Sequence, residues 1–208
     1  MTLTAFDLDS MPQRYRTNFV NTLSGYKSAN LVGTRHSDGR ENLALFSSAV
    51  HLGADPALLA LVSRPPVSDR HTLDNIEATG CFTVNQVHTD MVAAAHQCSA
   101  RYARDVSEFD AVGLTPWYSD TLQAPYVAES RLRLGLVLRE LVPVALNDTV
   151  IIIGEITEVF TDAEKVGEDG YVDIEGLEAV AVSGLDSYHR TQRVARLPYA
   201  KPGHSIRD

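Results

Sequence analysis

Short apolar stretches separated by turn residues predict a chain rich in β-strands. Residues 30–35 and 42–50 are typical of strands, and the Asp-Gly pair within residues 36–40 favours a tight turn between two antiparallel strands. The apolar run over residues 57–63 is bounded by proline-containing turns, which indicates a central strand buried on both faces. The first third of the chain is therefore expected to consist largely of paired strands.

Later segments continue this pattern. Residues 81–87 alternate between apolar and polar positions, and residues 129–140 and 148–161 are dense in β-branched side chains. Pro143 lacks a backbone N–H, so it belongs at a strand boundary or an edge, and residues 167–170 are typical of an acidic turn. Antiparallel pairing with intervening helices accounts for this order better than a doubly wound parallel sheet.

Helices are expected between these strands. A helix over residues 10–25, capped by Ser10, should pack its apolar face across one end of a barrel. Residues 72–79 predict a helix that a following glycine ends, residues 89–100 predict another, and a short helix starts at Ser107.

Nothing divides the chain into separate units. No internal repeat or low-complexity linker is present, and 208 residues that are 44% apolar suffice for one core. We expect a single domain over residues 1–208, mainly β with flanking helices. It ends in a basic tail over residues 189–208, which holds five basic residues against one acid.

Composition argues against several classes of partner. A formal charge of -9 would repel a nucleic-acid backbone, so DNA and RNA are not expected to bind. The longest apolar runs, over residues 57–62 and 150–153, are much shorter than the roughly 18 to 20 residues that cross a bilayer. The first residues have neither the basic start nor the apolar stretch of a secretory signal, which favours a cytoplasmic location.

Several common catalytic and metal-binding patterns are absent from the sequence. Cys81 and Cys98 are too few and too far apart for a disulfide framework, so we expect reduced, buried thiols. His51, His71 and His88 do not have the spacing of ligands on one helical face, and no metal is expected. The chain also lacks the glycine-rich dinucleotide fingerprint, the P-loop and the Gly-x-Ser-x-Gly and His-Glu-x-x-His motifs.

Two polar segments together indicate an anion site. Ser47 and Ser48 close a predicted strand, and Arg70 precedes a predicted helix that begins at Thr72. A helix start offers unpaired N–H groups and a partial positive charge, which suits a phosphate, and Arg64 would add a second positive group. The alternative is that these residues are only an ordinary helix start and polar strand ends.

A family resemblance adds to this interpretation. The motifs that carry it are Leu31-Val32-Gly33-Thr34, Asn42-Leu43-Ala44-Leu45-Phe46-Ser47-Ser48, Asp55-Pro56, Arg70-His71-Thr72-Leu73-Asp74-Asn75-Ile76, Gly80 and Val84-Asn85, followed by His96-Gln97-Cys98-Ser99-Ala100, Ser107-Glu108-Phe109-Asp110, Gly113-Leu114 and Gly184-Leu185-Asp186-Ser187-Tyr188. In their order and spacing they resemble the flavin reductase-like, FMN-binding split β-barrel family.

The resemblance implies an antiparallel split β-barrel that works as a homodimer, with FMN between the subunits. It implies a phosphate held near Ser48 and Thr72 and a flavin ring against the strand ends at Asn42 and Ser63. The residues expected to bind the cofactor are Thr34, Asn42, Phe46, Ser47, Ser48, Ser63, Arg64, Arg70, His71, Thr72, Asn75 and Ser99. One departure is His71, where many relatives carry an aspartate, and this leaves the substrate preference open.

The function implied is an NAD(P)H-dependent flavin reductase. Hydride would pass from a nicotinamide to flavin N5 and then to a second flavin, to oxygen or to another acceptor, with a partner monooxygenase as one destination. His96 is a candidate catalytic residue at the flavin edge; the alternative is a local hydrogen bond or a solvent-facing position. Two other functions stay open: a non-catalytic FMN-binding or flavin-carrier module, and a structural dimeric barrel without cofactor.

Two further groups of residues are candidates for contact with the cofactor. Trp117 and Tyr118 would lie over the flavin ring, or else simply pack in a loop. The basic tail, with Tyr188, His189 and Tyr199, would fold over the cofactor mouth and attract a dinucleotide, or else lie solvated on the surface.

Overall fold

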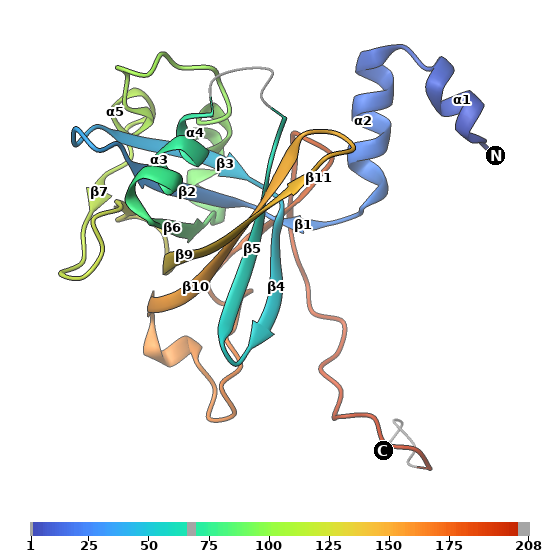
Figure 1. The fold of residues 1–208 in the computed structure, drawn as a ribbon. Helices are drawn as coiled ribbons and strands as arrows, with labels where there is room; N and C mark the ends of the chain where they lie inside the picture. Colours follow the sequence, from blue (N-terminus) through green and yellow to red (C-terminus); the bar gives the residue numbers. More distant parts are fainter. Residues whose placement is uncertain (1, 66–69, 204–208) are drawn as a thin grey trace.

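A computed structural model describes residues 2–65 and 70–203, and it confirms a mainly β chain with antiparallel sheets and flanking helices (Figure 1). The strands are β1 (Lys27–Ser28), β2 (Asn30–Arg35), β3 (Glu41–Phe46), β4 (Ala49–Ala54), β5 (Ala57–Ser63), β6 (Cys81–Gln86), β7 (Pro116–Trp117), β8 (Tyr126–Val127), β9 (Leu132–Val144), β10 (Thr149–Thr161), β11 (Val180–Ser183) and β12 (Ser187–Arg190). The helices are α1 (Ala5–Ser10), α2 (Gln13–Leu23), α3 (His71–Thr79), α4 (Val92–Gln97) and α5 (Glu108–Val112), with short 3-10 turns η1 (Thr89–Met91) and η2 (Ala163–Lys165).

The main sheet has seven strands in the order β3-β2-β6-β9-β10-β5-β4. Residues 42–50 were expected to form one strand, and this was wrong: β3 and β4 are separate strands at opposite ends of the sheet. Ser48 lies in the link between them, and its hydroxyl donates to the carbonyl of Val62 on β5 at 3.0 Å. The chain therefore leaves one end of the sheet and joins the other, so the sheet wraps around a core.

The long strands β9 and β10 connect the two halves of this wrapped sheet. β9 pairs with β6 through residues 133–137, and β10 pairs with β5 through residues 150–155. The register between β9 and β10 shifts at Gly154, where a Cβ would lie 2.6 Å from the Phe82 ring. Pro143 occurs beyond the segment that pairs with β6, where only one side of β9 has a partner strand.

Two apolar cores lie on opposite faces of β2 and β3. The core inside the barrel consists of Val32, Leu61, Leu73, Ile76, Phe82, Val84, Leu136 and Ile152. The outer core joins Leu31 and Leu43 to Ala95 and Cys98 of the α4 region and to Phe109 of α5. Because side chains alternate along a strand, these two strands contribute to both cores.

Helix α3 closes the barrel core. Its Leu73 and Ile76 are buried, and it ends at Gly80, whose φ of 71° allows its N–H to bond the carbonyl of Ile76 at 2.8 Å. The expected helix over residues 72–79 and the strand that follows it are confirmed.

The N-terminal helix was predicted wrongly in its start and in its packing. Thr4 caps a separate helix α1, which ends before Met11, and α2 starts after Pro12. Neither helix contains a buried side chain, and Figure 1 shows both projecting beside the barrel. Tyr15 and Phe19 stack on each other rather than on the core, with ring centroids 6.3 Å apart.

In the later part of the chain one predicted helix differs from the structure in length, and two strands were not predicted. The helix predicted over residues 89–100 is a 3-10 turn followed by the shorter α4, and the short helix at Ser107 is confirmed as α5. Strands β11 and β12 were not expected, and they form a second sheet with β1. The first residues of the predicted tail thus belong to a strand.

Among the described residues no helix is long and apolar enough to cross a bilayer, and no three metal-ligating side chains form a group. Cys81 and Cys98 are free and buried, as expected. Burial is the main reason that the pKa of Cys98 is raised to about 12.

Candidate functional site

Four buried polar side chains meet where α3 begins against β2 and β3. The amide nitrogen of Asn42 donates to the hydroxyls of Thr34 at 3.2 Å and Thr72 at 3.1 Å, and the amide of Asn75 donates to Thr34 at 3.1 Å. We call Thr34, Asn42, Thr72 and Asn75 the polar quartet; at most 8% of each residue is exposed.

The fold explains why these four residues converge. Thr34 and Asn42 face each other across the β2–β3 pair, so their side chains project from one face of the sheet. Thr72 and Asn75 are three positions apart in α3, which places them on one side of the helix. Apolar packing of Leu73 and Ile76 into the barrel core then brings the helix start down onto the strands.

A small, largely basic cavity adjoins the polar quartet. It is lined by His36, Arg40, Glu41, Asn42, His71, Asn75, Arg104 and Val106, and its volume of about 10 Å³ is just enough to hold one water molecule. The side-chain oxygen of Asn75 is buried and has no hydrogen-bond partner in the described part of the chain. The quartet therefore keeps an unused buried acceptor beside cationic groups and a helix N-terminus.

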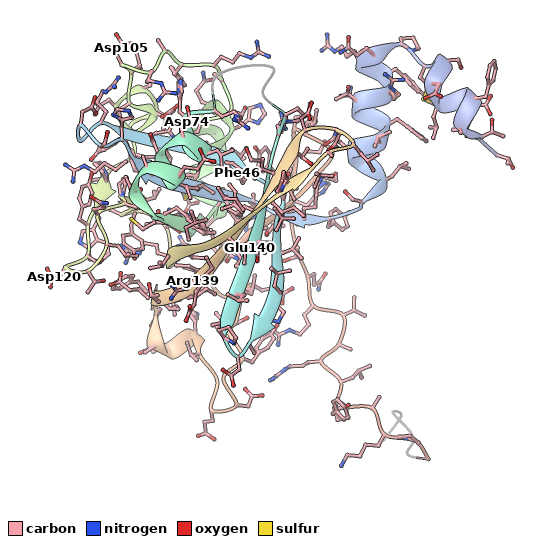
Figure 2. All side chains as sticks on the ribbon, viewed as in Figure 1. Phe46, Asp74, Asp105, Asp120, Arg139 and Glu140 are labelled. Atoms are coloured by element: carbon pink, nitrogen blue, oxygen red, sulfur yellow. The ribbon has the colours of Figure 1, made fainter. Side chains whose placement is uncertain are left out.

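Carboxylates compensate part of this positive charge. Arg104 pairs with Asp74 at 2.6 Å, and Asp74 is labelled on α3 in Figure 2. Arg40 pairs with Asp38 at 2.7 Å, and this contact holds the pKa of the Asp38 carboxyl far below its ordinary value. An incoming anion would compete with exposed carboxylates for these two arginines.

Glu108 is a buried acid that sequence reasoning missed as a site residue. Its carboxylate accepts the backbone N–H of Leu43 at 2.9 Å, on the open side of the edge strand β3. Burial raises its pKa, while the bond from Leu43 and the nearby His71 act in the opposite direction. The available signal was the position of Glu108 directly after Ser107, at the start of α5.

Three of the other predicted residues, Ser48, Ser63 and Arg64, lie away from the polar quartet. Ser48 accepts the N–H of Val62 at 3.3 Å as well as donating to its carbonyl, so its hydroxyl is held on β5. The length of β3 separates it from Asn42. Ser63, at the end of β5, is buried, and Arg64 after it is exposed.

Four more candidates occupy neighbouring parts of this region. Phe46 is partly buried and packs against the barrel core, and Ser47 is partly buried after it (Figure 2). Arg70 is the N-cap residue of α3 and His71 is its first residue, so both lie at the helix end that adjoins the quartet.

His96 and Ser99 lie on the far side of β3 from the quartet. His96 lies in α4 and Ser99 lies just after it, and this region packs against the outer core. The Nδ1 atom of His96 is 3.0 Å from the hydroxyl of Tyr188 on β12, and Ser99 donates to the His96 carbonyl at 2.6 Å. Within one chain the structure does not bring these two residues together with Thr72.

The predicted aromatic pair divides between two environments. Trp117 packs with Tyr126 and Phe160 in a small apolar cluster. Tyr118 donates its hydroxyl to Glu41, which lines the small cavity, and the Arg35 guanidinium lies 5.5 Å from its ring centroid.

The basic tail lies against an acidic turn of its own chain. Arg193 pairs with Asp173 at 3.2 Å, Arg196 pairs with Asp169, and both guanidinium groups lie over the ring of Tyr171. Tyr199 is 90% exposed. In the single chain the described part of the tail contacts this turn rather than the polar quartet.

Comparison with known proteins relates the fold to one family. The family model for the flavin reductase like domain matches residues 26–176. A crystal structure of a candidate flavin reductase with a split barrel domain from Shewanella frigidimarina is 46% identical; the match covers 96% of this chain and 100% of that one, with a TM-score of 0.93.

Two more distant structures share the fold. Nitrilotriacetate monooxygenase component B from Bacillus cereus is 19% identical over 95% of this chain and 98% of its own, with a TM-score of 0.84. An FMN-binding protein from Thermus thermophilus is 19% identical over 83% of this chain and 90% of its own, with a TM-score of 0.68. The family match covers most of the chain, and the wrapped antiparallel sheet agrees with it. The chain therefore belongs to the flavin reductase-like family of split-barrel proteins.

Proposed function

We propose that this protein binds FMN and acts as an NAD(P)H-dependent flavin reductase, as a homodimer in the cytoplasm. The observation that carries the proposal is the polar quartet at the start of α3, in a chain that belongs to the flavin reductase-like family. The Thr72 hydroxyl, the cationic side chains of the cavity and the helix N-terminus form a donor set that suits a phosphate.

The residues at the start of α3 would hold the phosphate end of FMN. The Thr72 hydroxyl accepts a bond from Asn42, and no bond donated by Thr72 is found among the described residues, so its proton is available to a phosphate oxygen. Arg70 and the first N–H groups of α3 would supply further donors. Asn42 fixes the position of the hydroxyl and keeps it aimed.

The strand ends beyond β3 and β5 would hold the flavin ring. FMN is elongated, so one molecule can contact two places that the length of β3 separates. We assign Phe46, Ser47, Ser48, Ser63 and Arg64 to this second contact. The two backbone bonds of Ser48 to Val62 would then fix the wall on which the ring lies.

A bound FMN would supply the redox chemistry, namely transfer of hydride from a nicotinamide to an acceptor. The chain would bind and orient the flavin and the nicotinamide, and hydride transfer between them needs no acid or base from the protein. His96 faces away from the quartet of its own chain. A role at the flavin edge would therefore place it against FMN held by the partner subunit.

The same comparison supports a proposal for the destination of the electrons. One structural neighbour is by name a component of a monooxygenase. We therefore include a partner monooxygenase among the acceptors of reduced flavin, beside free flavin and oxygen.

Anaerobic titration tests the proposal directly. Purified protein is mixed with FMN, NADH and NADPH are added separately, and the flavin absorption band is followed. Loss of the band with either nicotinamide supports the reductase. Tight FMN binding without reduction would instead identify a flavin-carrier module, and failure to bind FMN would leave a structural barrel. Light scattering should give twice the chain mass of 22.7 kDa.

A further inference from the structure

We infer that a second site, in a cleft beside the start of β9 and the end of β10, binds a small organic or inorganic oxyanion. The cleft has a volume of about 530 Å³, within the range of ligand pockets. It is lined by Ser130, Arg131, Arg133, Thr161, Asp162, Lys165, Gly176, Leu177 and Glu178. Its charged groups are three cations and two carboxylates.

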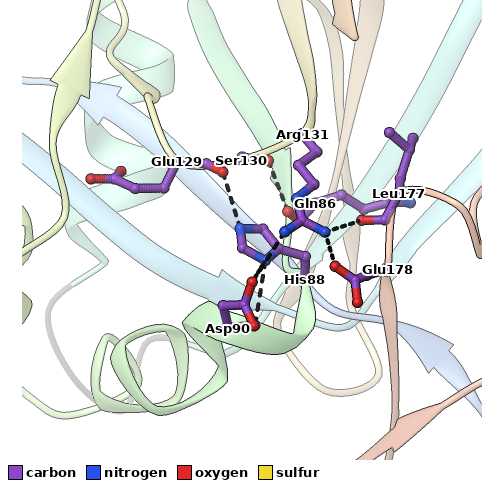
Figure 3. A network of polar contacts seen from close by, with 8 residues as sticks. All are labelled: Gln86, His88, Asp90, Glu129, Ser130, Arg131, Leu177 and Glu178. Atoms are coloured by element: carbon purple, nitrogen blue, oxygen red, sulfur yellow. Dashed lines mark hydrogen bonds and ion pairs between the residues drawn. The ribbon is translucent and has the colours of Figure 1, made fainter. Parts of the chain in front are cut away.

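Arg131 is already compensated and forms the fixed wall of the cleft. Figure 3 shows its guanidinium between Asp90, which it reaches at 3.0 Å, and Glu178. His88 and Ser130 extend this network through the Glu129 carbonyl and the Gln86 carbonyl. A ligand would gain little from Arg131, because two carboxylates already accept its donors.

Arg133 and Lys165 are the uncompensated cations. Neither forms an ion pair within the described residues, although the whole chain carries a formal charge of -9. The Arg133 guanidinium lies over Trp117, 4.9 Å from the ring centroid, and its Nε is buried without a hydrogen-bond partner in the described part of the chain. Burial lowers the pKa of this guanidinium.

An oxyanion would satisfy the donors that the cleft leaves unused. The Thr161 hydroxyl is also buried and unpartnered among the residues described. Asp162, the remaining carboxylate of the lining, accepts the N–H of Glu164 at 3.0 Å as the cap of η2, and it forms no ion pair with Lys165 in the described part of the chain. A planar guanidinium matches two oxygens of a carboxylate or a phosphate, and a lysine adds a point charge.

The backbone around the cleft is held in an uncommon conformation. Glu178 has a φ of 56°, which is rare for a residue other than glycine, and Arg131 holds its side chain. At Gly176 a Cβ would lie 3.3 Å from the Lys165 side chain and 2.3 Å from Asp173. A side chain at position 176 would therefore crowd the lysine stem against the cleft.

This cleft is separate from the residues assigned to FMN. Ser63 pairs with Val150 near the start of β10, whereas Thr161 is its last residue. Eleven residues of strand span roughly 35 Å. The lining of the cleft also shares no residue with those assigned to FMN, so flavin binding and oxyanion binding can each fail alone.

Trp117 is the only tryptophan of the chain, so its fluorescence reports on the cleft. FMN-saturated protein is titrated with inorganic phosphate and, separately, with benzoate, and calorimetry is run in parallel. We expect saturable binding of at least one anion. Arg133→Gln and Lys165→Gln should each weaken it about tenfold or more, and whichever anion binds more tightly identifies phosphate or carboxylate as the preferred group.

Arg139→Gln is the matched control, because Arg139 is an arginine of the same strand that pairs with Glu155 at 2.6 Å, outside the cleft. It should leave binding unchanged. Lys165 is on a surface turn, so its variant tests the site even if replacement of Arg133 disturbs packing. Absence of saturable binding for both anions, or equal binding by wild type and Lys165→Gln, would overturn the inference.

Discussion

The hydroxyl of Thr72 joins a helix start to a strand, and this makes it the sharpest residue-level test of the proposed phosphate contact. Thr72→Val removes the proposed bond to the phosphate, together with the acceptor of the Asn42 bond, while keeping the shape of the side chain. We expect FMN affinity to fall about tenfold, equivalent to about 1.4 kcal/mol. Fluorescence titration of FMN measures this change.

Thr79→Val provides the comparison on the same helix. Thr79 donates to the Asn75 carbonyl from the opposite end of α3. Its variant should bind FMN with wild-type affinity. If the Thr72 variant and the wild type bound FMN with equal affinity, the phosphate would have to be held by residues other than Thr72.

Glu108 should make stability depend on pH in a defined direction. Its pKa is raised above the ordinary value of 4.5, mainly by burial, so the folded chain holds the proton more tightly than the unfolded chain. The stability that Glu108 contributes is complete below the unfolded pKa and is lost as pH rises through the folded pKa.

Glu108→Gln keeps an acceptor for the Leu43 N–H but carries no charge. The free energy of unfolding of this variant, relative to wild type, should therefore increase as pH rises above about 4.5. Urea unfolding over a pH series measures the difference, with exposed Glu77→Gln as control. A difference that shrinks with rising pH would contradict the assignment.

At the scale of elements, close backbone approach decides where β2 can pack. A Cβ at Gly33 would lie 2.0 Å from the Pro125 carbonyl oxygen, and this contact is between backbone segments that cannot rotate away. Gly33→Ala should therefore lower the free energy of unfolding by about 1–3 kcal/mol. Urea unfolding checks the value.

Gly53→Ala is the matched change on β4. There the nearest atom is the Pro56 carbonyl oxygen at 3.4 Å, an ordinary contact. This variant should be much less destabilised than Gly33→Ala. Similar losses for the two variants would show that the approach of β2 to Pro125 is not what restricts position 33.

At the scale of the whole molecule, the basic tail is held by charges on the surface. Arg193→Gln combined with Arg196→Gln removes its pairs with Asp173 and Asp169. Exposed pairs contribute little to stability and are screened by salt. We expect faster proteolysis of residues 191–203 and an unchanged melting temperature.

Lys201→Gln removes a positive charge from the same tail without an ion pair to break among the described residues, so it should leave proteolysis unchanged. High salt should reproduce the effect of the double variant in wild type. A large fall in melting temperature would mean that the tail packs more deeply than its contacts indicate.

Sequence patterns over a few neighbouring residues were sufficient to predict those elements that depend only on neighbouring residues. Alternation predicted β6, the density of β-branched residues predicted β9 and β10, and Gly80 predicted the end of α3, because strand propensity and a left-handed cap depend on neighbouring residues. The break of residues 42–50 into two strands was not predictable this way, because it depends on the bond of Ser48 to Val62 on a distant strand.

The sequence by itself determined that the chain is mainly β and that phosphate-binding residue types stand at a helix start, since both follow from residue type and spacing. Only the tertiary structure decided that Asn42 and Thr34 face Thr72, that His96 lies across the sheet, and that Arg133 opens into a second cleft. The physical reason is that these neighbours are set by strand order and core packing, which bring together side chains far apart in the chain.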